Sequence, residues 1–152
     1  MGLPEICKID LHSKHKKGKL NLITDVVGVK VGNVTIQEGD VNTGVTAIIP
    51  HGGNVFLEKV MGAAVVLNGF GKSVGLVQIE ELGTIETPII LTNTFSVGTA
   101  VNALTKYMLK DNPDIGTSTG TVNCVVGECN DGKLNDIRVQ HVNESHIFEA
   151  IS

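Results

Sequence analysis

Residues 87–110, TPIILTNTFSVGTAVNALTKYMLK, contain the most informative pattern in the chain. The apolar run Thr87–Leu91 is short and nearly continuous, as expected for an interior strand of a sheet that is covered on both faces. In Ser96–Lys110 the apolar residues recur at helical spacing and form one stripe, and Thr94 or Ser96 can cap this helix. A buried strand that leads into an amphipathic helix predicts an α/β fold.

Further elements are predicted on both sides of this unit. Pro50 ends one of them, because proline lacks the N–H group that a strand ladder needs. A short final helix begins at Asn143, a good capping residue. Because that helix is brief and its apolar stripe only begins, we expect the natural chain to continue beyond Ser152. The other predicted strands are residues 28–34, 44–49, 61–67 and 121–126.

The composition indicates a compact globular protein. Of its 152 residues, 41% are hydrophobic and only 18% are charged, which predicts extensive burial within the chain or against a partner. No internal repeat or linker divides the chain. We therefore expect a polar lead-in over residues 1–19 and one domain, or part of one, over residues 20–152.

Charge and hydropathy disfavour several partners. The net charge of −4, one Tyr, four Phe and no Trp argue against nucleic-acid binding. The basic cluster at residues 14–19 is interpreted as a solvated segment. No apolar stretch is long enough to cross a bilayer and no secretory signal is visible, so we expect no membrane association and a cytoplasmic location.

The cysteines and histidines give no metal or disulfide pattern. Cys7, Cys124 and Cys129 contain no CxxC pair and are expected to be reduced thiols. His141 and His146 do not share a helical face at ligand spacing, so a helix-start or surface role is expected. The sequence predicts no metal site.

Residues 68–73, NGFGKS, end in a Gly-Lys-Ser motif that invites a phosphate-binding interpretation. A P-loop would need glycine where Val66 stands, and a dinucleotide fingerprint would need glycine at Val74. Tight glycine turns explain this segment better.

Three carboxylates, Glu80, Glu81 and Glu86, cluster around Gly83. They could form an acid/base pair, but side chains beside a turn are usually solvated, and solvation is the favoured interpretation.

Residues 127–132, GECNDG, form the most polar turn that directly follows a buried-looking strand. Sites are often built at strand ends. The alternative is a plain turn, with Asn130 and Asp131 bonded to their own backbone and Gly132 at positive φ. The residues alone favour the plain turn.

Several ordered blocks resemble the DmpA-type aminopeptidases, peptidase family S58, within a superfamily that includes the ornithine acetyltransferases. The resemblance runs from about residue 20 to the end of the sequence. The blocks are residues 22–32 (LITDVVGVKVG), 44–46 (GVT), 86–94 (ETPIILTNT), 96–98 (SVG), 125–132 (VVGECNDG) and 134–137 (LNDI).

The resemblance implies a self-processing Ntn-type hydrolase with a layered α-β-β-α sandwich, cut into α and β subunits that stay associated as a homo-oligomer. Its nucleophile would be the new N-terminal Ser or Thr of the β subunit, and its substrates short peptides or amides with a free amino terminus. Some relatives accept D-amino acids or β-peptides. No cofactor is implied.

Only part of that site can be placed in this chain. The resemblance assigns Glu128 to the substrate's ammonium group and places Asn130 where some relatives have a substrate-contacting Tyr. It assigns no catalytic residue here, because the nucleophile lies downstream in the family. The sequence is thus expected to be the N-terminal portion of an aminopeptidase, inactive alone. The alternatives are a non-catalytic binding or assembly subunit and a relative of the ornithine acetyltransferases.

Overall fold

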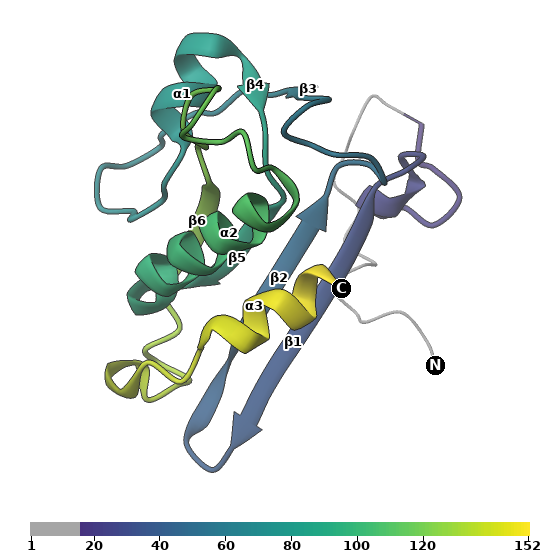
Figure 1. The fold of residues 1–152 in the computed structure, drawn as a ribbon. Helices are drawn as coiled ribbons and strands as arrows, with labels where there is room; N and C mark the ends of the chain where they lie inside the picture. The colour runs from purple at the N-terminus through teal and green to yellow at the C-terminus, as the bar shows by residue number, and fades with distance from the viewer. Residues whose placement is uncertain (1–15) are drawn as a thin grey trace.

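A computed structural model describes residues 16–152, and its centre is a four-stranded sheet in the order β1-β2-β5-β6 (Figure 1). Neighbouring strands are antiparallel except for β5 and β6, which run parallel. The strands are β1 (Lys30–Glu38), β2 (Val41–Ile49), β5 (Ile89–Asn93) and β6 (Val125–Cys129).

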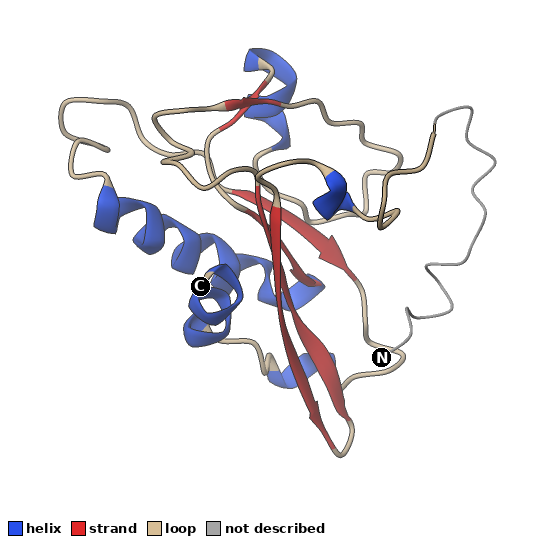
Figure 2. Cartoon of the chain, turned by 90° about the vertical axis from the view of Figure 1, so that its right-hand side faces the viewer, coloured by secondary structure: helices blue, strands red, loops and turns tan. Residues whose placement is uncertain are grey.

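Two helices cover one face of this sheet, as Figures 1 and 2 show. Helix α2 (Val97–Asp111) packs against β5 and β6, and α3 (Glu144–Ile151) packs against β1 and β2. Alternate strand residues point into this layer because side chains alternate between the faces of a sheet. The resulting core includes Val45, Ala47, Ile90, Leu104, Val126 and Ile147.

Helix α3 approaches β1 closely enough that only a glycine fits between them. An added Cβ atom at Gly32 would lie 1.9 Å from the backbone oxygen of Ala150. The absence of a side chain at Gly32 therefore sets how near α3 can lie to the sheet.

Neither α2 nor α3 lies on the opposite face of the sheet. Residues from all four strands line a hollow of about 480 Å³ there, including Asn33, Thr46, Leu91 and Cys129. The described residues thus supply one sheet and one helical layer of a sandwich.

A smaller unit lies beyond the end of the sheet. It contains α1 (Leu76–Leu82) and a two-stranded sheet of β3 (Val60–Met61) and β4 (Thr84–Ile85). Gly75 and Gly83 flank α1 with φ values of 89° and 66°, a conformation that glycine adopts without strain. The 3₁₀ turns within the described residues are η2 (Ile23–Asp25), η3 (Thr94–Ser96) and η4 (Ile137–Val139).

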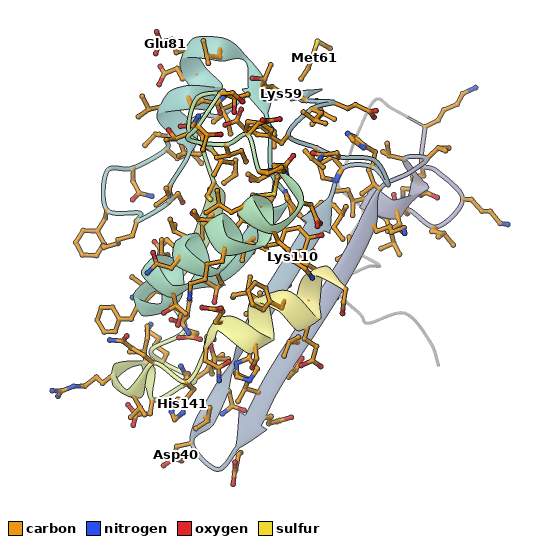
Figure 3. The ribbon with its side chains drawn as sticks, in the orientation of Figure 1. Asp40, Lys59, Met61, Glu81, Lys110 and His141 are labelled. Carbon is orange, nitrogen blue, oxygen red and sulfur yellow. The ribbon has the colours of Figure 1, made fainter. Side chains whose placement is uncertain are left out.

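The predicted interior strand at residues 61–67 is wrong. Only Val60 and Met61 pair with another strand, and the side chains of Met61 and Leu67 are 94% and 91% exposed. Figure 3 shows Met61 projecting outward, as Glu81 does on α1. Residues 62–67 are apolar, but they pair with no strand in the described part of the chain. They cross the surface as a loop.

The other predicted elements are present with shifted boundaries, whereas α1 and β4 were not predicted. The fifth predicted strand, at residues 121–126, begins and ends later as β6, which places Glu128 inside a strand. The side chain of Asn93, rather than Thr94 or Ser96, accepts a hydrogen bond at the turn that leads into α2. Asn143 caps α3 as predicted. No helix within residues 16–152 is long and apolar enough to cross a membrane.

Candidate functional site

The carboxyl ends of β5 and β6 bring together two sequence blocks that lie far apart in the chain. Thr92 pairs with Glu128 and Asn93 pairs with Cys129 in the parallel register. Because parallel strands end at the same edge of a sheet, polar residues that follow them gather there. The candidate site is built at this edge.

Glu128 is the central side chain of this edge. It is half-buried, and the buried hydroxyl of Thr94 donates a hydrogen bond to its Oε2 atom. The other oxygen, Oε1, faces the loop that contains Gly71, where an added Cβ atom would lie 3.7 Å away. Neither ion pair between described residues, Lys59–Glu86 or Lys106–Glu144, involves Glu128. One carboxylate oxygen is therefore fixed and the negative charge has no cationic partner in the described part of the chain.

A hollow of about 560 Å³ opens beside this carboxylate. Its volume lies within the range of roughly 300–1,000 Å³ that is common for small-ligand sites. Glu128 is the one charged residue in its lining, which otherwise consists of residues 65–71, Ser73 and Leu76.

Asn93 stabilises this edge through hydrogen bonds to two neighbouring segments. This side chain is only 3% exposed, and its Oδ1 accepts a hydrogen bond from the backbone N–H of Ser96 at 3.0 Å. Its Nδ2 donates to the hydroxyl of Thr43 on β2 at 2.8 Å. Asn93 therefore ties the start of α2 to the middle of the sheet and fixes the turn that carries Thr94.

Asn130 lies in the turn after β6 and is exposed. Its Oδ1 accepts a hydrogen bond from the N–H of Gly132 at 3.0 Å, as the plain-turn interpretation predicted. Asp131 instead uses its Oδ1 to accept from the Nδ2 of Asn135 at 3.3 Å, and Gly132 does not adopt positive φ, so those details were wrong. Asn130 does not line the hollow beside Glu128, and its contact with a substrate stays a prediction.

The three carboxylates around Gly83 do not form a site. Glu80 and Glu81 are exposed on α1, whereas Glu86 is only 5% exposed, so the prediction that it is solvated was wrong. Glu86 accepts hydrogen bonds from Asn123 N at 2.7 Å and Nδ2 at 2.9 Å and pairs with Lys59 Nζ at 2.9 Å.

The environment of Glu86 keeps it ionised. Burial raises its pKa, but hydrogen bonds from Lys59 and Asn123 and the lysine charge outweigh burial and leave the pKa below the usual value of 4.5. The carboxylate is fully used in joining three chain segments, so its role is structural.

His146 and Cys124 have structural surroundings. Nδ1 of His146 accepts a hydrogen bond from the N–H of Asn143, which confirms the helix-start role. Cys124 is buried, and burial raises the pKa of its thiol despite a hydrogen bond with Thr105. Cys124 and Cys129 are both free thiols, while Cys7 lies outside the described residues. Within residues 16–152, no His, Cys, Asp and Glu side chains gather in a way that could hold a metal ion.

The Gly-Lys-Ser segment forms a surface loop beside Glu128. The N–H of Phe70 donates to Asn68 Oδ1 at 3.0 Å, and the Lys72 ammonium lies 3.5 Å from the centre of the Phe70 ring. The next helix begins only at Leu76, so no helix N-terminus follows Ser73 directly. This geometry agrees with a turn and not with a P-loop.

Sequence reasoning missed Gly71 and the contact between Thr94 and Glu128. The sequence marks Thr94 only as a possible helix cap and as the last residue of the block at 86–94. One sequence signal could have revealed this contact, because both polar blocks directly follow buried strands. If those strands are parallel neighbours, the two blocks meet at one edge of the sheet.

Comparisons with known proteins agree with this architecture. The model of peptidase family S58 matches residues 21–152. The beta-peptidyl aminopeptidase BapA of Sphingosinicella microcystinivorans is 36% identical over 145 residues, which cover 90% of this chain and 35% of that protein. The chain thus spans about a third of the length of this relative.

Solved structures show the same relationship. The PH0078 protein from Pyrococcus horikoshii superimposes with a TM-score of 0.89 at 55% identity, covering 97% of this chain and 44% of that one. The L-aminopeptidase D-Ala-esterase/amidase from Ochrobactrum anthropi, described as a variant of the Ntn hydrolase fold, gives a TM-score of 0.79 at 32% identity, with 90% and 40% covered. These matches confirm the α/β fold class of the sandwich and the resemblance to the DmpA-type aminopeptidases. The chain belongs to peptidase family S58.

Proposed function

We propose that this chain is the N-terminal portion of a self-processing aminopeptidase and that Glu128 binds the ammonium group of the substrate. The single observation that supports this most strongly is the geometry of the carboxylate. One oxygen is held by Thr94, and no cation pairs with the charge among the described residues. A fixed, half-buried carboxylate forms strong charge-assisted hydrogen bonds with an ammonium group. It selects free amino termini over internal peptide bonds, which carry no charge there.

The nucleophile of the proposed reaction is a Ser or Thr at the new N-terminus of a downstream β-subunit segment. Its hydroxyl gives its proton to the new α-amine or a nearby group and attacks the carbonyl carbon of the first residue. The C–N bond to the rest of the substrate breaks, the leaving amine takes up that proton, and water then hydrolyses the acyl-enzyme ester, which releases the first residue and restores the hydroxyl. The open face of the sheet supports this arrangement, because neither α2 nor α3 covers it and the apolar side chain of Leu91 lies exposed there, as expected for a face that packs against a second sheet.

The substrates proposed are short peptides or amides with a free amino terminus. The names of the relatives, a beta-peptidyl aminopeptidase and an L-aminopeptidase D-Ala-esterase/amidase, support this class. Asn130 is proposed as a second substrate contact beside Glu128. We further propose that the enzyme is a cytoplasmic homo-oligomer that needs no cofactor. Cleavage of D-alanine amides is the measurement that tests whether it accepts D-residues, as the name of the Ochrobactrum anthropi relative indicates for that protein.

The test is made on the complete gene product. Intact mass and N-terminal sequencing of every band should show two polypeptides, the second beginning with Ser or Thr. The purified protein should release p-nitroaniline from aminoacyl anilides. An unprocessed, inactive protein would contradict the proposal and favour a binding or assembly subunit, and activity of residues 1–152 alone would contradict the assignment of the nucleophile.

A further inference from the structure

We propose that the hollow lined by residues 65–71 is the side-chain pocket of the site, so that the enzyme prefers substrates whose first residue is apolar. This inference rests on the proposed function of Glu128 and adds the substrate class. Part of this loop belongs to residues 68–73, which the sequence singles out for their glycines, and rejection of the phosphate-binding interpretation leaves them without a role.

The first step of the argument is proximity. In an α-amino acid, the side chain and the ammonium group are bonded to the same carbon atom. If Glu128 holds the ammonium, the first side chain of the substrate must lie within a few ångströms of the carboxylate. The hollow of about 560 Å³ is the space that adjoins it.

The second step is the chemistry of the lining. Val65, Val66, Leu67 and Phe70 present exposed apolar side chains, and Leu76 contributes from the start of α1. Ligand-binding grooves are one of the features that exposed apolar patches mark. Glu128 supplies the one charge in the lining, so the hollow complements a ligand with a single cation attached to an apolar group.

The third step identifies the residue that limits the size of that group. Gly71 lies against Glu128, and its backbone is outside the positive-φ region, so a larger residue is sterically permitted. A side chain at Gly71 would project beside the carboxylate and narrow the hollow. Gly52 is a matched control, because it is also exposed, has open space around its added Cβ, and does not line this hollow.

The experiment compares kcat/KM for Ala, Leu, Lys and Asp p-nitroanilides in the complete gene product. Wild type should favour Leu over Lys and Asp by roughly 10-fold or more. Gly71→Val should reduce the preference for Leu over Ala by about 10-fold, whereas Gly52→Val should leave it unchanged. Val66→Asp should shift the preference toward Lys, and Met61→Asp, an exposed residue outside the hollow, should not.

Two results would overturn the inference while leaving the proposed function intact. One is Glu128-dependent cleavage that does not distinguish Leu, Lys and Asp. The other is a change in kcat/KM by one common factor for all four substrates in Gly71→Val and Val66→Asp. Should Gly71→Val fail to fold, Val66→Asp decides alone, since it replaces an exposed side chain. Absence of any aminopeptidase activity in wild type would instead contradict the proposed function, and this inference with it.

Discussion

The hydroxyl of Thr94 donates a hydrogen bond to the carboxylate of Glu128 across the parallel pair of β5 and β6. The two residues are 34 positions apart in the chain and meet because both strands end at the same edge of the sheet. Thr94 is buried and lies in the turn that Asn93 fixes. A carboxylate held in this way presents its free oxygen in one direction.

Replacing Thr94 should therefore impair substrate binding through Glu128. We expect Thr94→Val to lower kcat/KM for free-amine anilides by about 5-fold to 10-fold, chiefly through KM, because one charge-assisted hydrogen bond is lost. Thr94→Ser should restore most of the activity, since it keeps the hydroxyl. Thr99→Val on α2 is the control, and an equal loss there would show that the effect is not specific to the contact with Glu128.

Asn93 should be important for stability rather than for substrate choice. Asn93→Ala removes the acceptor for the N–H of Ser96 and the donor to Thr43, both in a buried setting. We expect the free energy of unfolding to fall by roughly 2 kcal/mol. Asn93→Asp keeps the acceptor. Its free energy of unfolding, measured by urea titration, should therefore lie between those of wild type and Asn93→Ala. Equal stability of all three proteins would contradict this role.

The pair of Glu86 and Lys59 should make stability depend on pH. The pKa of Glu86 is lower in the folded state than its usual value of 4.5, so the unfolded state binds more protons between these two values. Its contribution is present above pH 4.5 and is lost as the pH falls toward the lower, folded-state pKa.

Glu86→Gln should accordingly reduce the free energy of unfolding by about 2 kcal/mol at neutral pH. The difference from wild type should shrink as the pH falls below 4.5. Urea titrations across this range provide the measurement, with the exposed Glu81→Gln as the control. A difference that is constant with pH would exclude the ionised carboxylate as its cause.

Gly32 should tolerate no side chain. Its added Cβ would lie 1.9 Å from the backbone oxygen of Ala150, so Gly32→Ala must push α3 away from β1. We expect a loss of roughly 2 kcal/mol in the free energy of unfolding. Gly120→Ala, where the added Cβ meets nothing within 4 Å, should be nearly neutral. Similar stability of the two variants would show that α3 does not pack on β1 as described.

The sequence predicted the elements whose signals are local. The apolar run at Thr87–Leu91, the stripe of α2 and the cap at Asn143 each depend on residues within a few positions. The end of β2 before Pro50 was equally clear, because proline cannot donate to a ladder.

The errors concern features that depend on distant partners. Apolarity at residues 61–67 does not reveal whether a strand pairs with them, and the structure leaves most of this run exposed. The burial of Glu86 depends on Lys59 and Asn123, which are remote in the sequence. Glu128 was placed by resemblance, but its contacts with Thr94 and the Gly71 loop required the parallel register of β5 and β6.

The most direct test of the account is the response of two substrates to Glu128→Gln in the complete gene product. The substitution keeps the shape of the side chain and removes its charge. We expect kcat/KM for leucine p-nitroanilide to fall by about 10-fold to 100-fold, equivalent to roughly 1.5–3 kcal/mol of charge-assisted binding. Residual cleavage of N-acetyl-leucine p-nitroanilide, which has no ammonium group, should not change. An equal loss on both substrates would contradict the assignment of Glu128 to the ammonium group.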